Sequence, residues 1–381
     1  MPDMTQRAVF TYDIDRERRD IDVSKDIARL LPDETPFAAI LMRAKKENTN
    51  TAEYVWFDEE PGGWWAKAEA TLVDATDIVV DDASLFAQHD IIKVPRTGEV
   101  MYVTASDLDT DTITVVRGYG TTAAAALEAD DWIMRMGNAM HEGSNAPDVK
   151  VKQPKKFVNF TQIFRTPFDQ TGTSAAESLK TNEKERVRLR KNKAIEHRLD
   201  IERAALFGEK KEDVANKRRM TGGVLSFIES NVMDISSGGG ALSESDFETY
   251  CEMLFQYGSK KKLLICSPRV GSVINQFATG KIQTRSGEDT YGIALSEYLS
   301  FHGRLYIVTS KTFEKEYAGM ALGVDMENIQ YRPLNGRDTS LKTNIQAEDY
   351  DGWKDEYFTE AGMQVRLEQT HAVLKGVTSA A

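Results

Sequence analysis

The most regular pattern along the chain is a long, charged, helix-forming stretch at residues 174–208. Neither Pro nor Gly interrupts it, and Gly208 stands where the C-terminal cap of a helix belongs. At its start, Ser174 and Glu177 have the S-x-x-E spacing of a capping box. We therefore predict one helix across the whole stretch, roughly 50 Å long at ~1.5 Å per residue.

The apolar residues of this helix form two thin stripes at heptad spacing instead of one broad arc. The stripes consist of Val187, Ala194 and Ile201, and of Ile195, Leu199 and Leu206. Opposite charges recur at i,i+3, which supports an exposed helix. These pairs are Glu177–Lys180, Glu183–Arg186, Glu185–Arg188, Lys193–Glu196 and Asp200–Arg203. The pattern favours a rod that lies across a surface and contacts a different neighbour on each side; a plain charged surface helix is the alternative.

A second pattern, between residues 69 and 136, alternates short apolar segments with turn residues. The segments are 78–80, 91–92, 100–103, 113–116 and 132–134. Five short strands at such close intervals predict a small β-barrel or sandwich. The block carries thirteen acidic and four basic side chains, a net charge of −9, and so holds most of the negative charge of the chain.

Strand-like segments flank this acidic block on both sides. Residues 51–57, TAEYVWF, are aromatic and β-branched, and residues 149–164 return with a similar pattern. We predict a long hairpin with a domain inserted at its far end. Residues 1–35, before the hairpin, are polar and read as an extended arm.

After the long helix, the sequence alternates helical and strand patterns. Phe247, Tyr250 and Leu254 have the spacing of an amphipathic helix, and residues 263–266 and 305–308 read as buried strands. Strands mixed with helices in this order predict an α+β unit.

Composition narrows the function classes. The 381 residues are 41% apolar and 28% charged, which indicates a globular protein, and the net charge of −12 argues against a protein that mainly grips nucleic acid. Cys251 and Cys266 lie in apolar surroundings and are expected to be buried. The sequence has neither a signal peptide nor an 18-residue apolar run, so we expect a cytosolic product and no membrane contact.

Candidate catalytic groups do not cluster in the sequence. The five histidines are scattered, and the run Asp107-x-Asp109-x-Asp111 lacks the glycine and glutamate that a calcium loop needs. Gly238–Gly240 is not followed by Lys-Ser/Thr, so it is not a phosphate-binding loop. We therefore expect no enzyme activity, metal site or cofactor.

The order of arm, hairpin, rod helix and α+β unit resembles the major capsid proteins of tailed bacteriophages, which have the Hong Kong 97 fold. The resemblance covers nearly the whole chain. Besides the rod, it is carried by IARLLPDETPFAAIL (27–41), EYVWFDEE (53–60), VPRTGEVMYV (94–103), VVRGYGTT (115–122), TGGVL (221–225) and LLICSPRVGSVINQF (263–277).

This resemblance implies a domain plan and a function. It divides the chain into an N-terminal arm (1–50), an extended loop (51–68 and 137–167), an inserted β-domain (69–136), a peripheral domain with the spine helix (168–220 and 331–381) and an axial domain (221–330). It implies self-assembly as hexamers and pentamers into an icosahedral shell around packaged double-stranded DNA. The implied partners are portal and scaffolding proteins, with a decoration protein left open, and the shell would assemble in the host cytoplasm as part of the virion. An encapsulin-type nanocompartment shell and an α+β enzyme with an accessory barrel are the alternatives.

Two charge runs are candidates for contacts between subunits. The returning hairpin strand is basic, and we expect it to meet acidic residues of the adjacent subunit, on its late acidic segment or its rod helix. The basic candidates are Lys150, Lys152, Lys155 and Lys156, and the acidic ones are Glu196, Asp200, Glu202, Glu348, Asp349, Asp351, Asp355 and Glu356. Both runs could instead serve only to keep the surface soluble.

Overall fold

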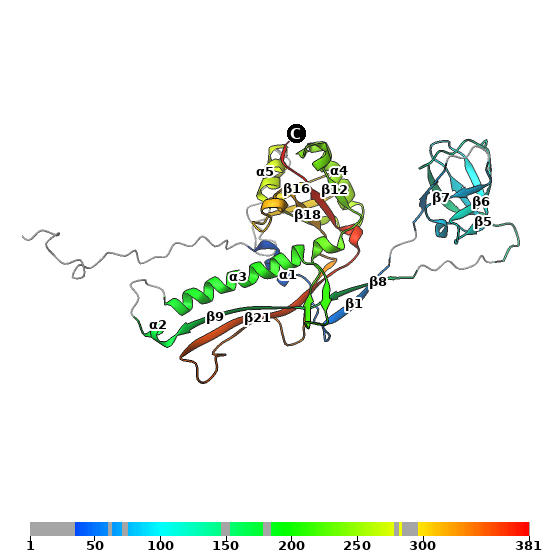
Figure 1. Cartoon of the computed structure of the whole chain (residues 1–381). Helices are drawn as coiled ribbons and strands as arrows, with labels where there is room; N and C mark the ends of the chain where they lie inside the picture. The colour runs from blue at the N-terminus through cyan, green and yellow to red at the C-terminus, as the bar shows by residue number, and fades with distance from the viewer. Residues whose placement is uncertain are drawn as a thin grey trace, which may run out of the picture. The chain divides into compact units, whose positions relative to one another are not determined.

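The computed structural model describes residues 35–59, 63–70, 75–145, 153–177, 184–277, 282–283 and 296–380 (Figure 1). The expected arm therefore lies outside the described residues apart from Thr35. The chain forms two compact units. One contains the described residues up to Trp56 and from Lys156 onward, and the other runs from Phe57 to Lys155.

The smaller unit is a six-stranded antiparallel sheet with the order β2-β7-β4-β5-β6-β3. Its strands are β2 (Trp65–Lys67), β3 (Asp77–Val79), β4 (Asp90–Lys93), β5 (Val100–Asp107), β6 (Thr112–Val116) and β7 (Trp132–Asn138), and a short 3₁₀ turn, η3 (Ala83–Leu85), follows β3. An antiparallel bridge between Ala68 and Val80 joins the two ends of the sheet, so the sheet closes into a barrel.

Buried and exposed residues alternate along these strands, and the buried apolar side chains form the core of the barrel. Ile78, Ile92, Met101, Ile113 and Ile133 are all fully buried inside it. All five strands predicted from the sequence are present. The sixth, β2, pairs with β7 and belongs to the same sheet, whereas the sequence placed it in the hairpin. A three-residue strand is too short to show the alternation on which that prediction depended.

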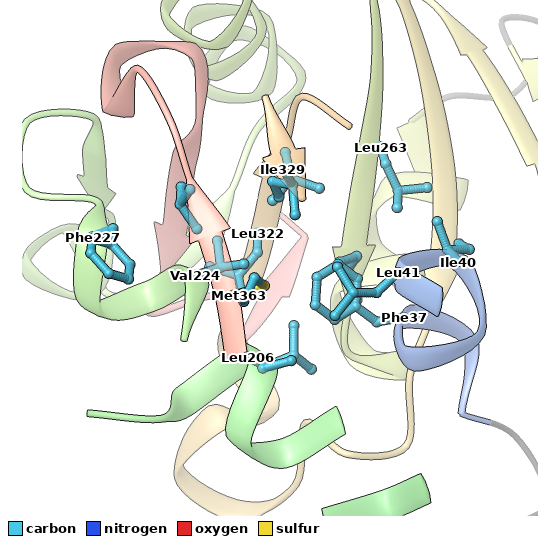
Figure 2. Packing of buried hydrophobic residues seen from close by; sticks show 14 of the residues in the cluster. Phe37, Ile40, Leu41, Leu206, Val224, Phe227, Leu263, Leu322, Ile329 and Met363 are labelled. Atoms are coloured by element: carbon cyan, nitrogen blue, oxygen red, sulfur yellow. The ribbon is translucent and has the colours of Figure 1, made fainter. Parts of the chain in front are cut away.

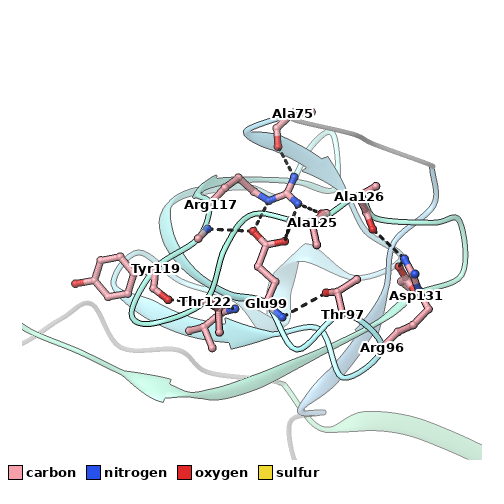
Figure 3. A network of polar contacts seen from close by, with 12 residues as sticks. Ala75, Arg96, Thr97, Glu99, Arg117, Tyr119, Thr122, Ala125, Ala126 and Asp131 are labelled. Atoms are coloured by element: carbon pink, nitrogen blue, oxygen red, sulfur yellow. Dashed lines mark hydrogen bonds and ion pairs between the residues drawn. The ribbon is translucent and has the colours of Figure 1, made fainter.

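One buried ion pair fixes a long loop over the barrel (Figure 3). Glu99 is fully buried and accepts hydrogen bonds from Arg117 Nε and Nη2, both at 2.7 Å. The backbone amides of Gly118 and Ala125 donate to the same carboxylate at 3.0 and 3.1 Å. Burial opposes ionisation of Glu99, but these donors outweigh it and lower its pKa.

The larger unit contains a long four-stranded sheet in which β21 is central. Its strands are β9 (Gln162–Thr171), β19 (Ile329–Pro333), β20 (Ser340–Lys342) and β21 (Gly352–Val365). β9 pairs with β21 over ten residues, from Gly352 opposite Thr171 to Ala361 opposite Gln162. The long helix α3 (Glu185–Phe207) contacts both of these strands (Figure 1).

Helix α3 is shorter at its start than the sequence predicts. Ser174 lies inside a separate short helix, α2 (Gly172–Ala176), whose cap is Thr171. Glu177 ends α2 in an extended conformation, so the predicted capping box does not form. The predicted start at Ser174 is wrong because Thr171, three residues earlier, supplies the capping oxygen for Ser174 N at 3.3 Å.

The predicted end of the helix is confirmed, although for a different reason. Gly208 follows the last residue of α3 but has an extended conformation, with φ −60°, and not the left-handed one. A Cβ at Gly208 would lie 2.4 Å from Ala204 O and 2.5 Å from Thr221 O. Close approach of two backbone segments, and not a positive φ, therefore requires glycine here.

A seven-stranded sheet forms the rest of the larger unit, with the order β12-β22-β18-β14-β17-β16-β15. Its strands are β12 (Val232–Asp234), β14 (Lys261–Cys266), β15 (Ile282–Gln283), β16 (Ser296–Leu299), β17 (Arg304–Thr309), β18 (Ala321–Val324) and β22 (Ala372–Lys375). The sequence expectation assigned residues 331–381 to the domain of the long helix. β22 departs from it, since it pairs with β12 and β18.

Helices cover both faces of this sheet. α4 (Glu244–Phe255) and α5 (Pro268–Phe277) share one core with Leu264 and Cys266. Leu263 and Ile265 point to the opposite face, into a second core (Figure 2). There they join α1 (Pro36–Arg43), the end of α3 and the 3₁₀ turn η4 (Val224–Phe227), with Phe37, Leu206 and Met363 all within 1% of full burial.

Short paired strands complete the larger unit. β1 (Glu53–Asp58) pairs with β8 (Lys155–Phe160), as expected for the two arms of the hairpin. The other pairs are β10 (Lys211–Asp213) with β11 (Arg218–Met220), and β13 (Ala241–Leu242) with β23 (Ser379–Ala380). Further 3₁₀ turns are η5 (Ser236–Gly238), η7 (Lys315–Gly319) and η8 (Glu368–Thr370). The mixed α+β architecture predicted from the sequence is present.

Candidate functional site

The late acidic segment lies on β21, and its first buried carboxylate faces α3. Asp355 is 1% exposed and accepts hydrogen bonds from Arg186 and Arg190 of α3. The backbone amide of Asn344 donates to it as well, at 2.9 Å. Asp355 is therefore held inside its own subunit, which contradicts its assignment as a contact to a neighbouring subunit.

Glu356 points to the other face of the same sheet and is buried as well, with 3% of its surface exposed. Arg165 of β9 donates to it from Nε at 2.9 Å and from Nη2 at 2.6 Å, and Lys342 Nζ lies 3.7 Å away. Glu356 and Arg165 border a surface cavity of about 360 Å³ that Pro167, Ile345 and Lys354 also line. The predicted contact of Glu356 with another subunit is likewise wrong, because β9 supplies its partner.

Glu202 is the third predicted contact residue that is internal. It lies in the last turns of α3 and is fully buried. Ser310 and Thr312 donate from their hydroxyls at 2.7 and 2.9 Å, and the amide of Ala38 donates at 3.2 Å. Glu202 therefore joins the helix to α1 and to the loop after β17, and it is not accessible to a neighbour.

His197 fixes the middle of α3 to the long sheet. Its Nδ1 lies 2.9 Å from Thr166 Oγ1 on β9, and its Nε2 lies 2.8 Å from Thr359 Oγ1 on β21. Burial lowers the pKa of His197, with the charge of Asp200 opposing the shift. The ring therefore favours the neutral state and acts as a structural connection between helix and sheet.

The other candidate contact residues that the structure describes lie at the surface. Glu348, Asp349 and Asp351 are exposed in the loop before β21, and Lys155 and Lys156 are exposed on β8. On α3, Glu196 pairs with Lys193 at 2.5 Å and Asp200 with Arg203 at 3.4 Å, as predicted, and Glu185 also pairs with Arg188. Lys150, Lys152, Lys180 and Glu183 lie outside the described residues.

The sequence did not indicate which arginines form ion pairs with the acidic segment. Arg186 and Arg190 are four residues apart, so they project from one face of α3 toward Asp355. The sequence interpretation paired Arg186 with Glu183 along the helix instead. Two arginines at i,i+4, facing a strand with an acidic residue in its interior, are the signal that could have suggested a bond between helix and sheet.

Several ionisable groups are buried in the larger unit as structural elements. Lys262 is 1% exposed, and its Nζ donates to the carbonyls of Leu254, Tyr257 and Thr370, each at 2.7 Å. Burial lowers its pKa to about 8. Cys251 and Cys266 are buried, as predicted, and burial raises the pKa of each to about 12.

The described part of the chain contains neither a candidate metal cluster nor a candidate membrane-spanning helix. Its His, Cys, Asp and Glu side chains form no group of three or more that could hold a metal ion. Among the same residues, no helix is long and apolar enough to cross a membrane. Among the groups described above, His197, Asp355 and Glu202 connect α3 to the elements packed against it.

Comparison with known proteins identifies a matching family and a curated relative. The model of the SU10 major capsid protein family matches residues 4–378. The major capsid protein of Pseudomonas phage PaMx41 is 25% identical over 293 residues, which cover 72% of this chain and 68% of that relative.

Two solved structures share the fold at low sequence identity. The capsid of cyanophage A-1(L) has a TM-score of 0.54 and 10% identity, covering 97% of this chain and 100% of the other. The capsid of the native GTA particle has a TM-score of 0.50 and 8% identity, covering 95% and 97%.

Proposed function

The chain belongs to the SU10 major capsid protein family, and from this we propose that it self-assembles as hexamers and pentamers into a closed icosahedral shell around packaged double-stranded DNA. It is a bacteriophage major capsid protein with the Hong Kong 97-type fold, a structural component of the virion. The observation that carries the proposal is the family match over residues 4–378, nearly the whole chain.

The fold supports the mechanical part of this function. His197 and Asp355 join α3 to the long sheet, and Glu202 joins its end to α1 and to the loop after β17, so the helix has little freedom to slide. A shell must transmit force between subunits without local unfolding, and a helix held to a sheet along much of its length suits that task. We assign α3, β9 and β21 to the peripheral domain of the family and the seven-stranded sheet to the axial domain.

We assign the barrel to a domain inserted in the extended loop that β1 and β8 begin and end. Its acidic composition suits a position that faces solvent on the outside of the shell. The negative net charge of the chain also suits a container in which DNA is packed by weak, non-specific contact. Portal and scaffolding proteins are the partners that such assembly needs, and it would take place in the host cytoplasm.

Contacts between subunits are proposed for the candidates that remain accessible. On the basic side these are Lys155 and Lys156, with Lys150 and Lys152 retained from the sequence. On the acidic side they are Glu196, Asp200, Glu348, Asp349 and Asp351. Single exposed ion pairs are worth only about 0–1 kcal/mol, so these contacts act by repetition around the shell and by steering assembly.

Electron microscopy of the chain expressed with its neighbouring gene products tests the proposal. We expect closed shells with five-fold and six-fold capsomers, and nuclease-protected DNA once the packaging proteins are present. Monomers under every condition, with and without a scaffold, would contradict assembly. Shells that carry protein cargo instead of DNA would favour the nanocompartment alternative.

A further inference from the structure

We propose that the turn at residues 300–303, with Phe301 at its tip, docks against the β12 edge of the next copy of this chain within a ring of subunits. This inference rests on the proposed function, because it names a contact within the proposed hexamers and pentamers. It concerns only the larger unit, in which both surfaces lie.

Phe301 is the most exposed large apolar side chain among the described residues. It is 99% exposed at the tip of the hairpin that joins β16 to β17, and Leu299 in the same hairpin is 38% exposed. A phenylalanine offers water no hydrogen bond, so full exposure is unfavourable and its burial in a complex is favourable. Aromatic side chains that a partner covers contribute most of the binding energy of many interfaces.

The turn that carries Phe301 is held rigidly by its neighbours. Ser300 N donates to Gly303 O at 3.1 Å, and Glu248 of α4 accepts from Ser300 Oγ and Tyr298 Oη at 3.1 and 3.0 Å. A Cβ at Gly303 would lie 2.6 Å from the Phe255 ring, so the turn packs directly on the end of α4. Phe301 is therefore presented on an ordered support, which reduces the entropy lost on binding.

The position of the turn in the sheet indicates which surface of a second copy it meets. β17 runs parallel to β14, β12 runs parallel to β22, and β18 is antiparallel to both β14 and β22. β12 and β17 therefore run in the same direction, and the segments that precede them lie at the same end of the sheet. The turn precedes β17 toward one edge, and residues 229–231 precede β12 at the other edge.

Opposite edges of one sheet are the surfaces that a closed ring brings together. In a ring, each contact is heterologous, so one face of a subunit meets a different face of the next. Two surfaces at the same end of the sheet, one toward each edge, stay level with each other when copies are related by rotation about an axis parallel to the strands. The turn of one copy then reaches the segment before β12 of its neighbour.

The charges of the two surfaces are complementary. Lys260 and Lys261 are exposed beside the turn, and Lys260 O accepts a hydrogen bond from Arg304 N at 2.9 Å. At the other edge, Glu229 is exposed, and its amide donates to the Glu368 carboxylate at 2.9 Å. The lysines beside the turn and the glutamates at the facing edge are opposite in sign, which favours this register over its reverse.

Disulfide trapping in assembled particles tests the contact. The variant Phe301→Cys with Ser230→Cys places one thiol on each surface, while the native Cys251 and Cys266 are fully buried. After oxidation we expect a ladder of covalent oligomers, up to five and six copies, in non-reducing electrophoresis. Phe301→Cys with Val214→Cys is the matched control, because Val214 is 76% exposed in the turn between β10 and β11 and should yield no ladder.

The outcomes separate this inference from the proposed function. Intact particles that give no more ladder than the control pair would overturn the contact and leave shell assembly standing. An unmodified chain that forms no particles under any condition would instead refute the proposed function.

A second measurement covers the case in which the cysteine pair does not assemble. Phe301→Ser should raise the subunit concentration needed for shells at least about tenfold, with the melting temperature of the free subunit unchanged. Phe301→Leu should restore most of the assembly, and Val214→Ser should leave it unchanged. Normal assembly of Phe301→Ser would overturn the proposal.

Discussion

Arg186 of α3 donates two hydrogen bonds to Asp355 of β21, from Nη2 to Oδ1 at 2.7 Å and from Nε to Oδ2 at 3.0 Å. Arg190 adds a third, to Oδ2 at 3.1 Å. Burial opposes ionisation of Asp355, but the donors outweigh it and lower its pKa. The bond lies near the start of α3, where Val187 is 43% exposed, so charge and not apolar burial holds this part of the helix.

We expect Asp355→Ala to destabilise the subunit strongly. Removing the carboxylate leaves two arginines without their shared acceptor, and breaking a buried pair costs about 3–5 kcal/mol. Because the side chains of Arg186 and Arg190 are 31% and 39% exposed, water compensates in part, and we expect about 2–3 kcal/mol. Chemical unfolding of the free subunit measures this loss.

Asp349→Ala is the matched control for this prediction. Asp349 is exposed in the loop just before β21, so its removal should change the free energy of unfolding by less than about 0.5 kcal/mol. Equal losses of unfolding free energy in the two variants would show that the ion pairs of Asp355 with α3 contribute no more to stability than an exposed carboxylate does.

The sequence predicted elements with strong local signals and missed what depends on distant partners. The barrel strands alternate clearly, and the end of α3 at Gly208 was found. The start of α3 was predicted wrongly. Ser174 has the sequence signature of a helix cap, but Thr171 caps a separate short helix that contains Ser174. A capping motif states a local preference, and which residue satisfies it depends on where β9 ends.

The candidate contacts show the same division. The acidic run on β21 was interpreted as a surface feature, because the local sequence does not show that β9 and α3 pack against this strand. Burial of Asp355 and Glu356 follows from strand pairing and from Arg165, Arg186 and Arg190, which lie 165 to 191 residues away in the chain. Charge patterns along one segment do not reveal such long-range partners.

The barrel should fold without the rest of the chain. A fragment of residues 57–155 contains all six strands and the Glu99–Arg117 ion pair, so it should unfold cooperatively. A fragment of residues 69–136 lacks β2 and the bridge from Ala68 to Val80, so its barrel cannot close. Circular dichroism during thermal unfolding distinguishes the two, and a disordered spectrum for the longer fragment would refute an independent domain.

Mild acid should weaken the larger unit through His371. This ring is fully buried, with Nδ1 accepting from Asp325 N and Nε2 bonded to Arg366 O, each at 3.1 Å. Burial lowers its pKa to about 4. Between pH 6.5 and 4 the unfolded chain therefore binds a proton that the folded chain does not, and stability falls as the pH falls.

The size of this effect follows from the shift in pKa. One unit corresponds to about 1.4 kcal/mol, so His371 should account for roughly 2–4 kcal/mol across this range. His371→Gln keeps one donor and one acceptor, and it should flatten the dependence of the unfolding free energy on pH while it lowers stability at pH 7. An unchanged pH dependence in this variant would assign acid sensitivity to other groups, such as His197.

The charged strand β8 should act in assembly and not in folding. Lys155 and Lys156 are exposed, and the exposed carboxylates Glu348, Asp349 and Asp351 remain available for a neighbouring subunit, whereas Asp355 and Glu356 are internal. Each exposed ion pair is weak, but a closed shell repeats the contact at every subunit, so small energies add and orientation is steered.

Charge reversal of β8 tests this role. Lys155→Glu with Lys156→Glu should change subunit stability by less than about 0.5 kcal/mol and still reduce the yield of shells. High salt should slow early association of the unmodified chain, since screening weakens exposed pairs beyond ~10 Å at 0.1 M. The control Lys211→Glu with Lys217→Glu changes net charge equally on the β10–β11 hairpin, so a comparable loss of assembly there would attribute the effect to total charge and not to β8.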